Sequence, residues 1–269
     1  MSGFEANLNL PLRVLATALS VVLIFPIVIV VVLSFGGEGY MHFPPKSFSM
    51  HWYRAVLGNA DWISAFWRSV VIGIVTSFIS TFAGFFGAYS LLRSKLKIKQ
   101  LILAVVMLPL IVPTIVSSVG MYYVADTLDL VGSKLAIAVC HAVIALPVVV
   151  VILLNALKSV DENLERAAYS LGASRIATFA HVVVPLAIPG VVSASLFGFL
   201  TSFDEVIIAI FMSGVTSETL PVRIWNSMRM DVDPSIAAVN SLLVGVALAV
   251  LLIEFAFRSR RKIRSDARM

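Results

Sequence analysis

Six apolar stretches, each about as long as a lipid bilayer is thick, constrain the fold of this 269-residue chain more than any other feature. A helix crosses a hydrocarbon core of about 30 Å with roughly 20 apolar residues. Helices satisfy their own backbone hydrogen bonds in that environment. The sequence therefore predicts an all-α, polytopic membrane protein with one transmembrane domain over residues 1–269. The six predicted spans cover residues 13–34, 69–92, 100–124, 133–156, 186–213 and 236–257.

The composition excludes a soluble enzyme. Hydrophobic residues make up 59% of the chain and charged residues 13%, against roughly 25% charged in soluble domains. The spans leave no room for a globular catalytic domain, so we expect no catalytic residue and no cofactor bound by this chain. Cys140 has no second cysteine to form a metal-binding pair, and we expect no metal site. We interpret Cys140 and the adjacent His141 as core residues.

The positively charged residues predict the orientation of the chain. If both termini are cytoplasmic, six of the 20 Lys and Arg residues lie on the outer side and the other fourteen on the inner side. Such an excess is typical of the cytoplasmic side, and it explains the net charge of +5 without a nucleic-acid partner. The first span is longer than a signal peptide and lacks a cleavage site, so we expect it to remain as an anchor. The six outer residues are Lys46, Arg54, Arg68, Lys134, Arg223 and Arg229.

A polar interruption at residues 159–184 separates the fourth and fifth spans, on the predicted cytoplasmic side. Its apolar residues recur with the i, i+3, i+4, i+7 spacing of a short amphipathic helix. The apolar positions are Leu164, Ala167, Ala168 and Leu171, and the opposite face carries Glu162, Glu165, Arg166 and Tyr169.

Capping residues predict the ends of this helix and a second one. Ser159 and Asp161 are candidate N-caps, Gly172 is a stop, and Ser174 starts a short helix that runs toward Pro185. The sequence therefore predicts a helix–turn–helix hairpin at the membrane surface. Periodicity alone supports a docking hairpin and a helix that rests on lipid or packs between spans about equally.

The order of residues in this hairpin resembles a known motif. ERAAYSLGAS at 165–174, followed by VVVP at 182–185, is similar to the EAA motif of permease subunits of bacterial ABC importers. In that motif a Glu-Ala-Ala triplet precedes a glycine by four positions, and Ile-x-Leu-Pro follows downstream. The spacing agrees throughout. The sequence departs from the motif at two places. Arg166 stands where the family has Glu, with Glu165 immediately before it, and Val182 and Val184 replace Ile and Leu.

Four further blocks look like those of the second permease subunit of spermidine/putrescine-type importers. They are HWYRAVLGN (51–59), LPLIVPTIV (108–116), SFDEVIIAIFMSG (202–214) and TLPVRIW (219–225).

This resemblance implies a bacterial inner-membrane importer for a small, cationic, polyamine-like solute. It implies as partners a second, homologous permease subunit, two cytosolic ATPase subunits that bind ATP and Mg, and an extracytoplasmic solute-binding protein. No GxxxxGK[ST] loop occurs here, so this chain is not the ATPase. By resemblance, coupling to the ATPase is assigned to Glu165, Arg166, Ala167, Ala168, Gly172, Val184 and Pro185.

Two acidic residues interrupt the apolar fifth span. An ionised side chain inside a membrane costs about 2.5–3.5 kcal/mol on insertion scales, which makes Asp204 and Glu205 candidates for function. With Ser202 and Phe203 they form the predicted translocation path or gate. Adjacent helical residues point about 100° apart, so both acids line one path only if the helix is broken there.

The alternative for the acidic pair is structural. Either carboxylate could pair with Arg68 or Arg223, or accept hydrogen bonds from the backbone of an unwound turn.

Smaller signals predict bends and close helix contacts. Proline bends helices, and pairs of small residues four apart let helices approach. The prolines are Pro109, Pro113 and Pro147, and the small pairs are Ser80–Gly84 and Ala83–Gly87.

Two other classes of protein remain as alternatives. One is a stand-alone secondary transporter or channel driven by an ion gradient, for which we expect inverted repeats that the sequence does not show. The other is a membrane scaffold without transport, in which the acidic pair is purely structural.

Overall fold

The computed structural model describes residues 2–230 and 234–266, and the side chains of residues 12–229, 234–249 and 252. These residues form helices and connections, with one isolated antiparallel β-bridge between Gly36 and Phe48, which confirms the all-α prediction. The elements are α1 (Ser2–Ser34), α2 (His51–Gly58), α3 (Ala60–Arg93), α4 (Lys99–Ile111), α5 (Thr114–Thr127), α6 (Lys134–Lys158), α7 (Glu162–Ser170), α8 (Arg175–Thr178), the π-helix η1 (Phe179–Val183), α9 (Val184–Phe203), α10 (Ile207–Met212), α11 (Leu220–Met230) and α12 (Ser235–Asp266).

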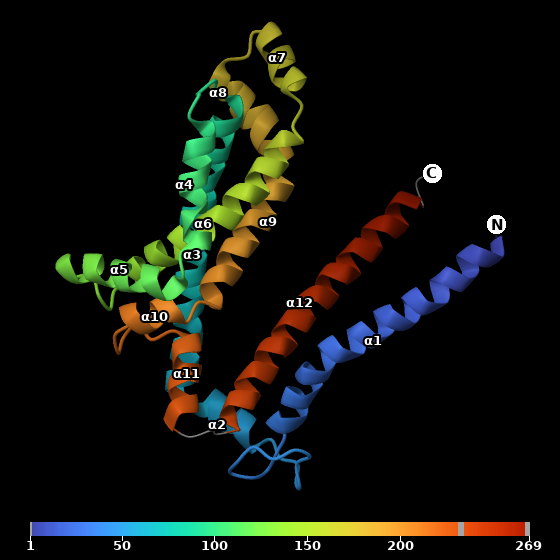
Figure 1. Ribbon diagram of the computed structural model, residues 1–269, viewed down its shortest axis with the longest axis vertical. Coiled ribbons are helices and arrows are strands. Elements are labelled where there is room, and N and C mark those ends of the chain that lie inside the picture. Colours follow the sequence, from blue (N-terminus) through green and yellow to red (C-terminus); the bar gives the residue numbers. More distant parts are fainter. Residues whose placement is uncertain (1, 231–233, 267–269) are drawn as a thin grey trace. The chain divides into compact units, whose positions relative to one another are not determined.

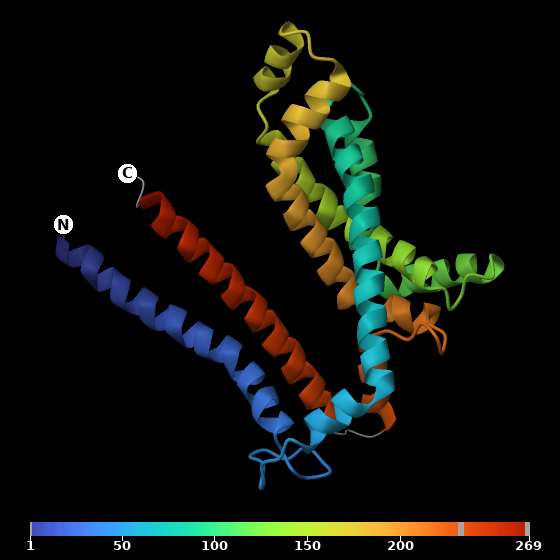
Figure 2. The ribbon, with the colours of Figure 1, turned by 180° about the vertical axis from the view of Figure 1, so that it is seen from behind.

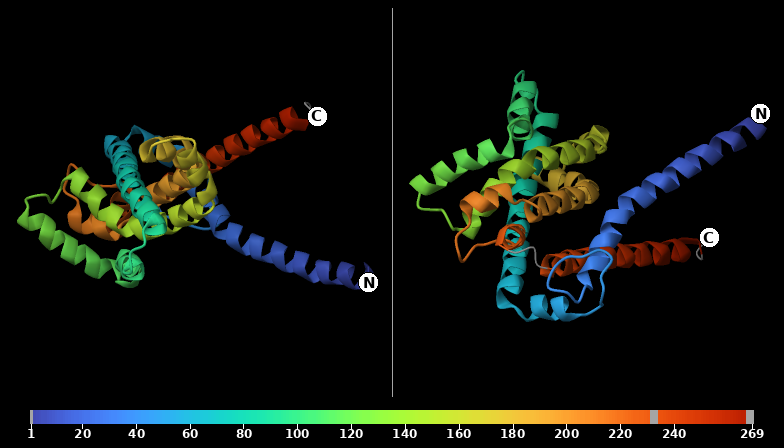
Figure 3. Two further views of the ribbon diagram at one scale, coloured as in Figure 1. Left: turned by 90° about the horizontal axis from the view of Figure 1, so that it is seen from above. Right: turned by 60° about the horizontal axis from the view of Figure 1, so that its bottom comes forward.

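The helices group into two units. The first contains the residues up to Ile63 and those from Asn226 onward, and the second spans Ser64–Trp225. In the first unit α12 contacts α1 and α2, and Figure 3 shows α1 and α12 diverging toward the termini. Tyr53 of α2 links both long helices, because its hydroxyl lies 2.6 Å from that of Ser34 and donates to Ser241 at 3.0 Å.

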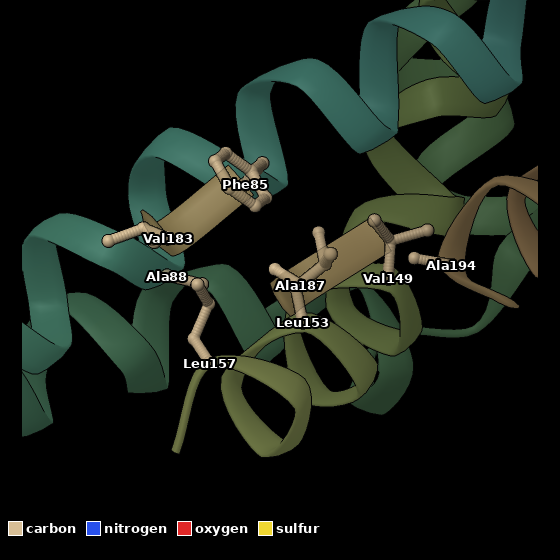
Figure 4. Close-up of a cluster of buried hydrophobic side chains, with 8 residues drawn as sticks. All are labelled: Phe85, Ala88, Val149, Leu153, Leu157, Val183, Ala187 and Ala194. Atoms are coloured by element: carbon tan, nitrogen blue, oxygen red, sulfur yellow. The ribbon is translucent and has the colours of Figure 1, made fainter. Parts of the chain in front are cut away.

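The second unit is built on α3, α6 and α9. Helix α3 runs along the length of this unit, with α6 and α9 beside it (Figures 1 and 2). The three helices and η1 enclose a core of apolar side chains (Figure 4). A second core joins α3, α5, α6 and α10. The first core contains Phe85, Ala88, Val149, Leu153, Leu157, Val183, Ala187 and Ala194, and the second contains Ile72, Ala125, Ile137, Ala138, Ile208 and Met212.

Small residues let these helices approach closely. A Cβ added to Gly84 would lie 3.0 Å from a methyl group of Val149 on α6, and one added to Gly198 of α9 would lie 2.8 Å from the Ser80 hydroxyl. The predicted Ser80–Gly84 pair is therefore confirmed as a close contact. A Cβ on Gly87 would meet no atom within 4 Å, so the Ala83–Gly87 prediction is wrong for contacts among the residues that the structure describes.

Several helices are long and apolar enough to cross a membrane. Within the described part of the chain there are four, or five if a bent pair counts as one span. The four are Leu12–Ser34, Ala60–Arg93, Lys134–Lys158 and Arg175–Phe203, the bent pair is α4 with α5, and Ser235–Ala249 forms a shorter apolar helix.

The predicted third span, residues 100–124, is two helices rather than one. Helices α4 and α5 meet at an angle of 102°. Val112 between them has an extended backbone with ψ of 129°, which is the conformation that a following proline imposes. Pro113 therefore breaks the span, whereas Pro109 and Pro147 lie inside continuous helices.

We predict that Gly84→Val destabilises the bundle and that Gly87→Val does not. Both changes add the same β-branched side chain to α3, but only the first forces it against Val149. Overpacking of this kind costs about 1–3 kcal/mol. The measurement is the thermal unfolding midpoint of the purified chain in detergent. Equal midpoints for the two variants would contradict the packing described here.

Candidate functional site

Helix α7 begins and ends where the sequence predicts. The Asp161 carboxylate accepts a hydrogen bond at 2.8 Å from a backbone N–H of the first turn, a typical N-cap. At the other end Gly172 has a φ of +85°, which favours glycine. The N–H groups of Gly172 and Ala173 donate to the carbonyls of Tyr169 and Ala168, and these two bonds make a Schellman motif. Local chemistry thus fixes both ends of α7.

The second predicted helix of the hairpin is not a separate element. Ser174 caps α8 as predicted, but α8 continues through η1 into α9, so Arg175–Phe203 is one helical segment. In η1 the Val184 N–H donates to the Phe179 carbonyl, five residues back. This wider turn takes up an extra residue just before Pro185, which has no N–H to donate. The helix therefore passes the proline instead of stopping there.

One polar residue of α7 is buried, whereas several apolar residues of the hairpin are exposed. Glu165, on the polar face, is buried at 6% exposure. On the apolar face Leu164 is 47% exposed, Leu171 is 89% exposed, and Ala167 is also exposed. Ile176 at the start of α8 adds a further apolar side chain, 82% exposed. We call Leu164, Ala167, Leu171 and Ile176 the exposed apolar face.

The buried carboxylate of Glu165 is bound by two residues of α3. Arg93 Nε donates to Glu165 Oε1 at 2.8 Å, and the Tyr89 hydroxyl donates to Oε2 at 3.2 Å. Sequence reasoning counted Arg93 only as an inner-side charge and assigned no role to Tyr89. Their i, i+4 spacing at the end of an apolar span was the signal available, because it places both side chains on one face.

The other predicted coupling residues are exposed or half-buried. Arg166 is 73% exposed and makes a 3.5 Å ion pair with Glu162. Ala168 is half-buried, Val184 packs against the first core, and Pro185 is exposed. At the position where the sequence departs from the family pattern, Glu165 is thus bound within the chain and Arg166 faces outward.

The predicted fifth span is broken at the acidic pair. Helix α9 ends at Phe203 and α10 begins at Ile207. The Glu205 carboxylate accepts hydrogen bonds from the backbone N–H groups of Ile207 and Ile208, at 2.8 and 3.0 Å. It thereby satisfies the N-terminus of α10. The hypothesis that an acid supports an unwound turn is confirmed for Glu205.

Asp204 is in a different situation from its neighbour. Its side chain is exposed and makes no hydrogen bond or ion pair with any residue that the structure describes. The suggested ion pairs with arginine are wrong in this part of the chain, because Arg223 pairs with Glu218 and Arg68 donates to the Val215 carbonyl. The acidic pair thus consists of one structural carboxylate and one available carboxylate.

Ser202 and Phe203 hold the end of α9. Ser202 is buried, and its hydroxyl lies 2.8 Å from Nδ1 of His141 on α6, which confirms His141 as a hydrogen-bonded core residue. Phe203 stacks on Phe199, with ring centroids 5.6 Å apart, and meets Phe66 of α3 edge to face. These contacts fix the helix end from which Asp204 projects.

Comparison with known sequences identifies the family. Residues 80–262 match the family described as binding-protein-dependent transport system inner membrane component. The chain is 30% identical over 231 residues to the spermidine/putrescine transport system permease protein PotC of Haemophilus influenzae, covering 86% of this chain and 90% of the relative. It is 32% identical to the putrescine transport system permease protein PotI of Escherichia coli K12 over 126 residues, 47% of this chain and 45% of PotI.

Solved structures agree on the fold. A bacterial ABC transporter involved in the import of the acidic polysaccharide alginate matches with a TM-score of 0.67 and 16% identity, over 95% of this chain and 96% of that one. An amino acid ABC transporter matches with a TM-score of 0.56 and 19% identity, over 77% of this chain and 98% of that one. Sequence family and fold point the same way, and the chain belongs to the family of binding-protein-dependent transport system inner membrane components.

Proposed function

We propose that this permease subunit carries a small, polyamine-like cation across the bacterial inner membrane as part of an ATP-driven importer. The observation that carries the proposal for the solute is the exposed Asp204 carboxylate, which has no partner among the described residues and lies beside a break in an apolar helix. A carboxylate in such a position attracts cations. The names of the relatives PotC and PotI, for spermidine/putrescine and putrescine, support the same class of solute. Membership in this family favours an importer over a stand-alone secondary transporter or a scaffold.

The proposed topology is one permease domain over residues 1–269, with six spans and both termini in the cytoplasm. Five of the spans correspond to helices or a bent helix pair of suitable length and composition. Helix α12 is the proposed sixth span. The excess of Lys and Arg on one side supports this orientation. In the proposed topology the hairpin at 159–184 lies in the cytosol.

The proposed complex contains a second, homologous permease subunit, two cytosolic ATPase subunits and an extracytoplasmic binding protein. ATP and Mg would be bound by the ATPase subunits. This division of tasks agrees with the sequence, which carries no phosphate-binding loop.

Helix α7 is the proposed coupling helix that docks on the ATPase. A helix in aqueous surroundings normally buries its apolar side, yet on the exposed apolar face Leu164, Leu171 and Ile176 are 47%, 89% and 82% exposed in the part of the chain that the structure describes. Exposed apolar side chains gathered on one short hairpin are suited to bind another protein. Arg166, at 73% exposure, adds a positive charge beside it.

Replacing Gly172 with valine should uncouple the importer. A β-branched residue at φ of +85° is strained by about 1–3 kcal/mol, so the Schellman turn and the aim of α7 would change. We expect Gly172→Val to abolish solute-stimulated ATP hydrolysis by the reconstituted complex while membrane insertion persists. Gly172→Asn is the matched control, because asparagine tolerates a positive φ, and it should retain most of the stimulation. Full stimulation in the valine variant would contradict the coupling role.

The double change Leu171→Ser and Ile176→Ser should weaken binding of the ATPase. Both side chains are more than four-fifths exposed in this chain, so their loss should leave its thermal stability unchanged. The affinity should fall by about tenfold or more, since burial of a large apolar side chain contributes about 1.5–3 kcal/mol. The measurement is the amount of ATPase that co-purifies as salt and detergent are held constant. Leu96→Ser, on a neighbouring exposed loop, is the control, and an equal loss there would argue against a specific docking face.

Asp204 and Glu205 should respond differently to substitution. Asp204→Asn should lower putrescine or spermidine uptake, by about fivefold or more if the carboxylate contributes 1 kcal/mol or more to passage, with no change in thermal stability. Glu205→Ala should lower stability by about 0.5–2 kcal/mol, because the cap of α10 is lost. Uptake assays in proteoliposomes and thermal unfolding separate the two effects. Normal uptake by Asp204→Asn would remove this residue from the path.

A further inference from the structure

The most densely bonded charge in the described part of the chain is Arg93, the last residue of α3. Nε and Nη2 of its guanidinium group both contact Oε1 of Glu165. Nη1 donates to Oε1 of Glu162 at 3.0 Å, and Nη2 donates to the Val160 carbonyl at 3.3 Å. One side chain thus binds the connection after α6, the first turn of α7 and the middle of α7 at once.

Both charged partners of this contact, Glu165 and Arg93, are largely shielded from solvent. The side chain of Glu165 is 7% exposed and that of Arg93 is 20% exposed. A buried carboxylate is unfavourable unless its oxygens are bonded, and here Oε1 contacts Arg93 while Oε2 accepts from Tyr89. Removal of Arg93 would leave Glu165 buried and unpaired, so Arg93 and Glu165 hold their relative position strongly.

Little else attaches α7 to α3. The apolar side chains of Leu164 in α7 and of Leu171 just after it are 47% and 89% exposed. Beside this contact lies an open cavity of about 600 Å³, lined by residues of α3, α7, α8 and η1 that include Phe86, Tyr89 and Phe179. The polar contact of Arg93 and Tyr89 with Glu165 forms part of its wall and joins α3 to α7 there.

We propose that Arg93 is a positioning residue that makes α7 and α3 move as one body during energy coupling. The proposal rests on the proposed function of α7 as the ATPase-docking helix. When the ATPase displaces α7, the guanidinium contact passes the displacement directly to the end of α3. Coupling of this kind needs a rigid, contiguous link, and the planar fork of Arg provides more rigid geometry than a lysine ammonium.

Helix α3 is suited to carry that displacement onward. It is continuous from Ala60 to Arg93. Ser77 on α3 donates to the Ser195 carbonyl of α9 at 2.6 Å, and Ser69 accepts from the Leu220 N–H of α11 at 2.8 Å. A shift at Arg93 is therefore passed to α9, whose far end is the break at Asp204.

The first test measures solute imported per ATP hydrolysed by the reconstituted importer. We expect Arg93→Ala to lower this ratio by about fivefold or more, in the usual range of coupling between sites. Arg93→Lys keeps the charge but loses the planar guanidinium group. Its ratio should lie between that of the unchanged chain and that of Arg93→Ala. Lys97→Ala removes an exposed cation from the loop that follows α3 and is the matched control. An unchanged ratio for Arg93→Ala, whatever the yield of complex, would overturn the proposal.

The second test measures the motion itself. In a Cys140→Ser background, spin labels at Lys95→Cys and Ser170→Cys report the distance between the end of α3 and α7 in the assembled complex. With Arg93 present, ATP binding should leave this distance constant within the width of the distribution. With Arg93→Ala it should lengthen or broaden. A change on ATP binding in the chain that retains Arg93 would show that α7 moves independently and would also overturn the proposal.

Failure of the proposed function gives a different result. In that case the chain that retains Arg93 would bind no ATPase, and neither the ratio nor the distance would respond to ATP. If only the role of Arg93 is wrong, ATP-driven import remains intact, and the chain with Arg93 and the Arg93→Ala variant give the same import ratio and the same label distance.

Discussion

The close approach of α3, α6 and α9 is the contact on which the rest of the second unit depends. It rests on the absence of side-chain bulk: a Cβ at Gly190 of α9 would overlap Ala156 of α6, and one at Gly198 would press on α3. Without a hydrophobic driving force between helices in lipid, such van der Waals packing and short interhelical hydrogen bonds provide the association. The two candidate sites follow from this bundle, because the hairpin joins α6 to the start of α8 and α9, and the broken segment follows the end of α9.

Each end of the bundle has two acidic residues close in sequence, and the two ends hold them differently. Glu165 is held by Arg93 and Tyr89, and Glu162 also pairs with Arg93 although its side chain is 54% exposed. Glu205 caps α10, whereas Asp204 has no partner among the residues that the structure describes. A bound carboxylate fixes backbone geometry, and Asp204 is thereby held in a defined place where it can meet a solute.

The sequence predicts the local features well and the longer-range ones poorly. The caps at Asp161 and Ser174 and the stop at Gly172 were predictable, because a side chain or a positive φ acts within a few residues. The passage of the helix through Pro185 was not, since it depends on a π-turn that no residue type encodes by itself. The inward orientation of Glu165 was also missed. Amphipathic periodicity divides a helix into two sides but does not say which side packs against the rest of the chain. That choice is made by Arg93, 72 positions away.

The π-turn at Phe179–Val183 separates the length of the chain from the direction of the hairpin. An i→i+5 turn holds one residue more than an α-helical turn, so the extra residue is taken up inside the turn. The helix on either side of it keeps nearly the phase it would have without that residue. A lineage that lost one residue here could close the turn to an α-helical one and still present the same side of α8 to its surroundings. The turn is thus a place where chain length can change while the exposed side chains, such as Ile176, keep their direction.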